Sequence, residues 1–276
     1  MKSNKILKTI LAGAIVATTS ISVFAAAPES TRNGCGLLPG YSQLKAALIQ
    51  AVADETSGIN LQMWGTIVDR DGVVCAVAFS GANRGEQWPG SRVISAQKAN
   101  TANAFSLDGL ALSTANLYSA AQGTSAATPM GGSLYGLQFS NPVDPAVAYG
   151  GNPADAGTRN DYMVGKRVGG VNVFGGGLGL YNSDERIIGG VGVSGDTSCA
   201  DHMIAWRVRH TLHLDNFGTN AKGDPNVGGV SGDPLRPDNM IIDGINTVTS
   251  NGITDGFEQP SCLNTANPNT LPPVNR

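Results

Sequence analysis

All three histidines of the chain lie in one short segment, residues 201–214, whose spacing of apolar side chains predicts a helix. One side of this helix gathers aromatic and basic side chains: His202, Trp206, Arg209 and His213, with His210 beside them. An imidazole can ligate a metal ion, an indole can stack on a planar ring, and a guanidinium can pair with a carboxylate. The alternative for each histidine is a solvated face or an oligomer contact. We expect His202 to be the metal ligand, because it lies nearest the glycine turn before the helix.

That glycine turn belongs to the segment Ile187–Asp196, which reads as a strand leading into the helix. Residues 190–195 match the G-x-G-x-x-G pattern, but that pattern should open a βαβ unit, and we expect no second parallel strand after the helix. We therefore expect no NAD site. The first N–H groups of the helix, at Cys199–His202, suit a carboxylate or propionate. The residues of the turn expected to contact such a ligand are Gly192, Ser194 and Gly195.

A further basic side chain, Lys98, lies on a second expected helix, Ser91–Ser106. Lys98 could pair with an anionic group of the ligand, which would make it a binding residue. It could equally form an ion pair with an aspartate of the chain, and the sequence leaves both roles open. The candidate aspartates are Asp69, Asp71 and Asp201.

The four cysteines are Cys35, Cys75, Cys199 and Cys262, an even number that favours two disulfides in an exported protein. Three pairings are possible. We favour Cys35–Cys75 with Cys199–Cys262, because Cys35 and Cys262 lie in terminal segments that need fastening to the body. A thiolate zinc site is disfavoured, because the sequence has no C-x-x-C pair and its cysteine spacings are long.

The N-terminus has the layout of a secretory signal: the basic residues Lys2, Lys5 and Lys8, an apolar run from Ile10 to Val16, and small residues that suit cleavage near Ala25. The apolar run is short and gives way to Thr and Ser, which disfavours a membrane-spanning helix. We expect a secreted or periplasmic protein with no membrane span in the mature chain. The net charge of −3 offers no electrostatic footprint for nucleic acid or anionic membranes.

Apolar periodicity and turn signals predict helices that alternate with strand pairs. The expected helices are 41–57, 91–106 and 201–214, with a short one near 111–121; the expected strands are 61–68, 73–79, 175–181 and 186–193, with shorter ones at 135–139, 171–174 and 240–242. Strands joined by short turns pair antiparallel. The expected fold class is therefore α+β, an antiparallel sheet of about five strands flanked by helices.

The same patterns predict how the chain is divided. The expected parts are a signal peptide at 1–25, an N-terminal arm at 26–40, one domain at 41–214 with an insertion at 107–170, and a coil-rich extension at 215–276. The insertion is long for a loop of a compact domain, so we expect it to pack over the core. The extension has few apolar clusters, and we expect Cys262 to hold it in place.

Four segments resemble the GlcG/HbpS family, whose domain also occurs at the C-terminus of PduO-type corrinoid proteins. They are the helix at 41–57, the turn Thr66–Gly72 (like V-V-D-x-x-G), the helix Ser95–Ala102 (like A-x-x-K-A-x-T-A), and Gly175–Leu178 with Ile188–Gly195 and Asp201 (like G-G-x-P…G-A-I-G-V-S-G…D). Their order and spacing agree with the family over residues 41–213. Two features depart from it: Leu178 replaces the family's proline, and residues 107–170 are longer than in typical members, so any pocket that they line can differ.

The resemblance implies a profilin-like α/β/α sandwich that often forms oligomers. It also implies haem binding, with a haem-degrading activity attributed to the family in general terms. We therefore expect a homo-oligomer that binds haem or a similar tetrapyrrole through His202, Trp206, Arg209, Lys98 and the glycine turn. The binding is expected to be non-covalent, because the sequence has no C-x-x-C-H motif.

The sequence leaves open whether the protein is an enzyme, because no acid–base or nucleophile pair has the required signature. Two other functions remain. The chain could be a structural or assembly protein without a cofactor. It could also be an enzyme that acts on a small carboxylated metabolite held at the start of the helix at 201–214.

Overall fold

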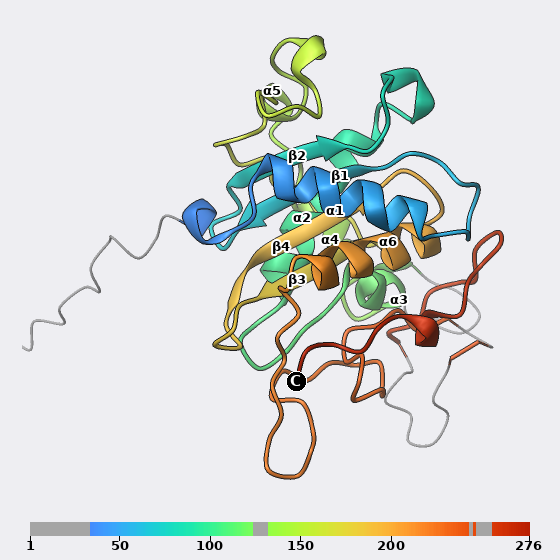
Figure 1. Ribbon diagram of the computed structural model, residues 1–276. Helices are drawn as coiled ribbons and strands as arrows, with labels where there is room; N and C mark the ends of the chain where they lie inside the picture. The colour runs from blue at the N-terminus through green and yellow to red at the C-terminus, as the bar shows by residue number, and fades with distance from the viewer. Residues whose placement is uncertain (1–33, 124–131, 243–244, 247–255) are drawn as a thin grey trace, which may run out of the picture. The chain divides into compact units, whose positions relative to one another are not determined.

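The centre of the structure is an antiparallel four-stranded sheet in the order β2-β1-β4-β3 (Figure 1). Its strands are β1 (Trp64–Asp69), β2 (Val74–Phe79), β3 (Gly177–Tyr181) and β4 (Ile187–Ser194). The computed structural model describes residues 34–123, 132–242, 245–246 and 256–276. The expected α+β class is confirmed, with four strands in place of about five. The segment 171–174 is not a strand, and Ile242 forms only an isolated bridge to Gln259.

Both predicted hairpins belong to this one sheet, because β1 pairs with β4 from Trp64↔Ser194 to Asp69↔Gly189. The first hairpin turns at Gly72, whose φ of +75° suits glycine. The carboxylate of Asp69 accepts the N–H groups of Asp71 and Val73 there, at 3.0 and 2.9 Å. These turn bonds explain why a short local pattern was enough to predict the hairpin.

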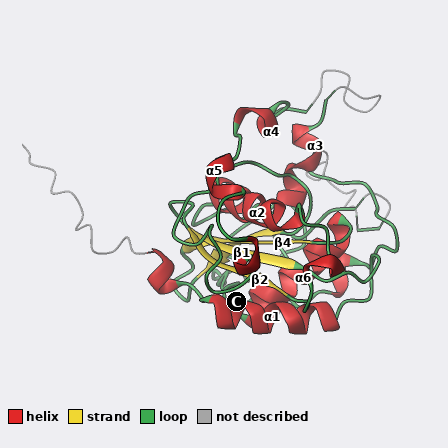
Figure 2. Ribbon diagram, turned by 90° about the horizontal axis from the view of Figure 1, so that it is seen from above, coloured by secondary structure: helices red, strands yellow, loops and turns green. Residues whose placement is uncertain are grey.

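Helices cover both faces of the sheet, which gives three layers (Figure 2). On one face lie α1 (Tyr41–Ala53) and α6 (Ser198–Thr211), and on the other lies α2 (Ser91–Phe105). Successive strand side chains point to opposite faces. Ile67 accordingly packs in the cluster with α1 and α6, while Val68 packs in the cluster with α2.

Two glycines of β4 bring α2 close to the sheet. A Cβ atom at Gly190 would overlap the carbonyl oxygen of Ala99, and one at Gly192 would overlap that of Ser95. The G-x-G-x-x-G match therefore has a packing explanation, since these glycines allow a helix backbone to approach a strand backbone.

The helix boundaries differ from the predicted ones by a few residues. Helix α1 ends at Ala53 instead of residue 57, and α6 begins at Ser198 instead of residue 201. The earlier start of α6 follows from Thr197, whose hydroxyl caps the helix by accepting the N–H of Ala200 at 3.2 Å. No helix among the described residues is long and apolar enough to cross a membrane.

The described residues of the segment 107–170 form only short elements: the 3₁₀ helices Thr114–Leu117 (η4) and Pro153–Asp155 (η5), and the α-helical turns α3 (Tyr118–Ala121), α4 (Leu137–Ser140) and α5 (Pro145–Ala148). Outside it, further 3₁₀ turns are η2 (Gly34–Leu37), η3 (Arg84–Glu86) and η6 (Pro268–Thr270). The prediction of a strand at 135–139 is wrong, because Gly136 has a φ of +90° and starts α4. The expected helix near 111–121 is present as η4 followed by α3.

Two disulfides join Cys35 to Cys75 and Cys199 to Cys262, as favoured from the sequence. The second disulfide fastens the C-terminal segment to the start of α6. The same segment also receives a hydrogen bond of 2.9 Å from the indole nitrogen of Trp206 at the carbonyl of Pro272. The residues after α6 therefore lie against that helix, which determines what a ligand could reach there.

Candidate functional site

The aromatic and basic stripe of α6 lies in the interior. His202, Trp206 and Arg209 are all 0 % exposed. The Arg209 guanidinium makes two hydrogen bonds to the carboxylate of Asp238, at 2.6 and 2.9 Å, and stacks over the Trp206 ring at 4.5 Å. The C-terminal segment covers this side of the helix, since Asp238 pairs with Arg209 and the Pro272 carbonyl accepts from the Trp206 indole. Ligand binding by these three residues of α6 stays a prediction.

His202 is held by that covering segment. Its Nε2 atom lies 3.2 Å from the N–H of Met240 and 3.3 Å from the amide oxygen of Asn239. Its Nδ1 atom has no hydrogen-bond partner among the described residues. Burial lowers the pKa of His202 to about 4, so the ring is neutral at physiological pH. Iron ligation by His202 stays a prediction, and it requires the segment around Asn239 to move. Of the other histidines, His210 contacts the carboxylate of Asp215 at 2.7 Å and His213 is exposed.

Lys98 takes the ion-pair role that the sequence left open. Its ammonium group lies 2.6 Å from the Asp201 carboxylate and donates to the carbonyl of Val193 at 3.0 Å. Burial lowers the pKa of Lys98 and raises that of Asp201 to about 6, while the pairing of the two charges opposes both shifts. Both side chains are almost fully enclosed, so Lys98 has a structural partner in place of an external anion.

The start of α6 is already capped. The N–H of Cys199 points to the Cys262 sulfur at 3.2 Å, and Thr197 receives the N–H of Ala200. Gly192 packs under α2, and the carbonyl of Gly195 accepts the Gln87 amide. Ser194, at the end of β4, is 4 % exposed. A shallow groove of about 340 Å³ does open beside this helix start, lined by Tyr118, Phe174, Ser198 and residues 260–262.

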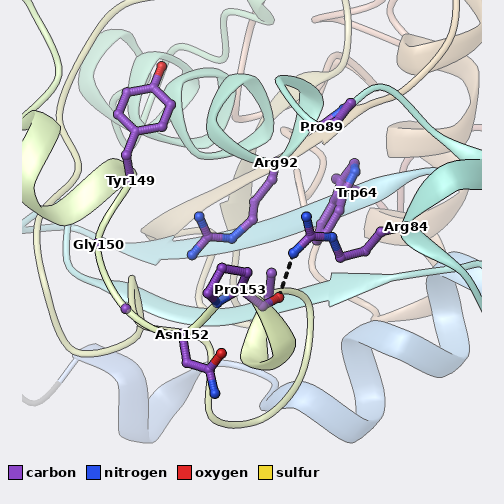
Figure 3. Close-up of a pocket in the computed structure, with 10 residues that line it drawn as sticks. Trp64, Arg84, Pro89, Arg92, Tyr149, Gly150, Asn152 and Pro153 are labelled. Atoms are coloured by element: carbon purple, nitrogen blue, oxygen red, sulfur yellow. Dashed lines mark hydrogen bonds between the residues drawn. The ribbon is translucent and has the colours of Figure 1, made fainter.

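The more enclosed cavity lies elsewhere, where the segment 107–170 meets the sheet (Figure 3). It has a volume of about 160 Å³. Its walls come from the start of β1, from η3, from the start of α2 and from the loop after α5: Trp64, Arg84, Pro89, Arg92, Tyr149–Pro153 and Ala156. Residues 149–153 and Ala156, which belong to the long segment 107–170, therefore form part of this lining.

A second cavity of about 480 Å³ adjoins the first, and Arg84 and Ala156 line both. Its other walls come from α1, β2 and the same loop: Tyr41, Lys45, Phe79, Gly81–Asn83, Ala154, Gly157 and Thr158. We call the two cavities together the insertion cleft. Every charged side chain in the two linings is basic, namely Lys45, Arg84 and Arg92.

Arg92 and Asp161 hold the wall of the cleft in position. The Arg92 guanidinium contacts both oxygens of the Asp161 carboxylate, at 2.8 and 2.5 Å, and donates to the carbonyl of Ala148 at 2.9 Å. Asp161 also accepts the N–H groups of Gly157 and Met163. One buried carboxylate therefore joins α2 to the loop that forms the far wall.

Trp64 and Arg84 are two polar side chains of the cleft that have unused hydrogen-bond donors. Trp64 is 2 % exposed and packs on Phe79 with ring centroids 4.7 Å apart, but its indole N–H has no partner among the described residues. Arg84 is exposed and donates to the carbonyl of Pro153 at 2.7 Å. In Figure 3 the Arg84 and Arg92 side chains both extend toward the loop that carries Pro153.

Few local patterns in the sequence indicate this site. Trp64 lies in a buried strand, and Arg84 lies in a loop. The one local signal was turn chemistry, since Asp144 and Asn152 each precede a proline and cap a short helix. Those caps shape the loop, but nothing local shows which strand it will cover.

The three layers define the protein as an α/β/α sandwich domain. Its basic, aromatic-lined cleft lies at the end of the sheet where β1 begins and β2 ends. Residues 42–209 match the family model described as "Haem degrading protein HbpS-like". The chain therefore belongs to the HbpS-like family, and the predicted family membership is confirmed.

Several solved structures are similar to part of this chain. Protein ORFY of Klebsiella pneumoniae, of family DUF336, is 26% identical, with 62% of this chain and 86% of that chain covered and a TM-score of 0.40. A PduOC:haem complex is 22% identical, with 62% of this chain and 90% of that chain covered and a TM-score of 0.40. A double mutant of Streptomyces reticuli HbpS is 16% identical, with 68% of this chain and 98% of that chain covered and a TM-score of 0.34. No match to this chain is found among curated proteins.

Proposed function

We propose that this protein binds haem or a similar tetrapyrrole non-covalently, in the insertion cleft. The observation that carries the proposal is the lining of that cleft, in which all charged side chains are basic and lie beside aromatic ones. Haem is a planar apolar ring with two carboxylates at one edge, so it suits such a lining. Membership of a family described by haem degradation, and a related PduOC structure with haem, support the same ligand.

The residues of the cleft fit the ring and the carboxylates better than they fit the iron. Among the described residues, the linings of the two cavities hold no histidine, cysteine or methionine. The side chains there that offer an oxygen ligand to ferric iron are the phenols of Tyr41 and Tyr149. Bound haem would supply redox chemistry at its iron, and the protein residues would hold and orient the ring. Whether haem is degraded is a separate question from binding.

A second part of the proposal concerns where the protein acts and how it is organised. We propose export to the periplasm or the medium, with cleavage of residues 1–25, which lie outside the described residues. Two disulfides support an oxidising compartment. The division into a domain at 41–214, with its insertion, and an extension at 215–276 also stays a proposal, as does assembly into a homo-oligomer.

A haemin titration of the mature chain tests binding, read from the Soret absorbance. We expect a saturable shift at a fixed stoichiometry. The variant Ala156→Trp should abolish it, because Ala156 lines both cavities and a tryptophan there would project into the space that the ring needs. Ala221→Trp is the matched control, on an exposed residue of the C-terminal segment.

Two results would overturn this proposal. One is the absence of any saturable shift in the native chain. The other is loss of the shift in His202→Gln together with its retention in Ala156→Trp, which would return the site to α6.

A small carboxylated metabolite is a second candidate ligand, and one observation favours it. The cavity beside Arg84 and Arg92 alone, at about 160 Å³, is below the usual size range of drug-sized ligand sites, roughly 300–1,000 Å³. Thermal shift with small mono- and dicarboxylic acids distinguishes this candidate from haem. Stabilisation by such acids, with no haemin shift, would favour a metabolite. Neither effect, in a protein of defined oligomeric state, would favour an assembly role.

A further inference from the structure

The indole of Trp64 is a hydrogen-bond donor without an acceptor. Its N–H is buried, and no described residue accepts from it. An indole has only this one polar atom, and buried donors in folded proteins are paired with few exceptions. Trp64 lines the insertion cleft, so a group bound there is a natural source of the missing acceptor. Such a group would have to be an oxygen acceptor on a ligand that fits against the indole.

Arg84 is the second side chain of the cleft with unused N–H donors. Its guanidinium has five N–H donors in a fixed fork. Among the described residues, only the carbonyl of Pro153 accepts from it. The side chain is exposed and belongs to the walls of both cavities, so the rest of the fork is available to a ligand in either. A planar fork of this kind matches a carboxylate with two parallel hydrogen bonds.

Arg92 differs from Arg84 in its hydrogen bonds, and we therefore infer different roles for the two arginines. All three guanidinium nitrogens of Arg92 already bond to Asp161 or to Ala148. Its charge is therefore neutralised, and its geometry is fixed. Arg92 is a positioning residue for the loop, while Arg84 is free to recognise an anion.

From these contacts we propose, building on the proposed function, that the cleft recognises the carboxylate edge of the tetrapyrrole, and that this edge anchors the ligand more than its iron does. Arg84 takes a carboxylate with its free N–H groups, and the Trp64 N–H donates to the same edge. The aromatic rings of Tyr149 and Phe79 contact the macrocycle. In the part of the chain that the structure describes, the linings hold no imidazole, thiolate or thioether to bind iron strongly, so a metal-free ring should bind by the same contacts.

Three ligands test the proposal with the full mature chain: haemin, metal-free protoporphyrin IX, and the dimethyl ester of protoporphyrin IX. Affinities are read by ultrafiltration of the free ligand, which does not depend on an iron signal. We expect haemin and protoporphyrin to bind within a few-fold of each other. The ester should bind on the order of tenfold more weakly or worse, because it loses charge-assisted hydrogen bonds.

Variants then locate the contact. Arg84→Gln should weaken protoporphyrin on the order of tenfold and leave the weak ester affinity unchanged, while Arg84→Lys restores part of the loss because it keeps the charge without the fork. Arg186→Gln is the matched control, because Arg186 is an exposed arginine that pairs with Asp108 and lines neither cavity. Trp64→Phe should have a similar effect to Arg84→Gln. Arg84 is exposed, so its variants keep the test valid even where Trp64→Phe lowers stability.

The outcomes separate this inference from the proposed function. Equal binding of the acid and the ester overturns carboxylate recognition and leaves tetrapyrrole binding standing. Binding of haemin without binding of protoporphyrin overturns the claim that iron is secondary. If none of the three ligands binds, the proposed function fails and this inference fails with it.

Discussion

Lys98 of α2 and Asp201 of α6 form an ion pair that links the helices on the two faces of the sheet. The ammonium nitrogen and the carboxylate oxygen are 2.6 Å apart, and both side chains are at most 3 % exposed. The lysine passes beside Gly176, where a Cβ atom would lie 3.2 Å from its nitrogen. Asp201 also accepts the N–H of Asp196 at 2.8 Å, so the pair fixes the turn between β4 and α6. A buried pair of this kind makes each partner depend on the other.

Removing one charge of the pair should destabilise the fold strongly. Asp201→Asn leaves the Lys98 ammonium buried without its counter-charge, and the expected loss in the free energy of unfolding is about 3–5 kcal/mol. Denaturant unfolding followed by circular dichroism measures it. The double variant Lys98→Met with Asp201→Leu should recover most of the loss, because neither charge is then buried. A loss below about 1 kcal/mol in Asp201→Asn would show that water reaches the pair.

Acid should weaken the fold through His202. Its pKa falls from 6.5 in the unfolded chain to about 4 in the folded protein, mainly by burial. The positive charges of Arg209 and Lys98 lower this pKa further, while the Asp238 carboxylate opposes the shift. As pH falls below 6.5, the His202 ring therefore becomes protonated in the unfolded chain while it stays neutral in the folded protein. The stability due to neutral His202 is complete above pH 6.5 and is lost as pH falls toward about 4, by roughly 2–3 kcal/mol.

The measurement for His202 is a comparison of unfolding curves at pH 7 and pH 4.5 for the native chain and for His202→Gln. The comparison is needed because Asp201, whose pKa is raised to about 6, acts in the opposite direction in the same range. Its protonation at low pH favours the folded state, since the folded protein prefers the neutral acid. The native chain should lose more stability on acidification than the variant, and equal losses in both would contradict the assignment.

The sheet could be predicted from the sequence because the residues that specify its turns and strands are close together in the chain. Asp69 and Gly72 specify the first hairpin through their own turn bonds, and the alternation of Ile67 and Val68 between the two cores follows from strand geometry. The family resemblance predicted the layered fold for the same reason, since its motifs are hairpin turns and helix faces.

The site could not be predicted, because its determinants are remote in sequence. Arg209 looked available for a ligand until Asp238, in a segment without helical or strand periodicity, supplied its counter-charge. Gly192 looked like a position for ligand approach, but it serves the approach of Ser95 on α2. In both cases a pattern that permits binding also permits close packing, and only the tertiary partner decides between them.

The C-terminal segment should become loose when its disulfide is removed. The bond between Cys199 and Cys262 closes 63 residues of chain, and the variant Cys199→Ser with Cys262→Ser is expected to lose about 2–4 kcal/mol of stability. Limited proteolysis should then cut first within the segment after α6. The same variant tests the predicted iron ligand, because freeing the segment uncovers His202. A stronger haemin signal that disappears on adding His202→Gln would support that ligand, and an unchanged signal would count against it.

The Arg92–Asp161 contact should control the shape of the insertion cleft. In Asp161→Asn the carboxylate charge is lost, and one of its oxygens becomes an N–H donor facing groups that are themselves donors: Arg92, Gly157 and Met163. We expect a loss of about 2–3 kcal/mol, faster hydrogen exchange in residues 149–163, and weaker haemin binding with an unchanged Soret position. Asp108→Asn is the control, because its pair with Arg186 is largely exposed and should contribute less than about 1 kcal/mol. Full haemin affinity in Asp161→Asn, with the loop demonstrably loosened, would show that the ligand does not depend on this wall.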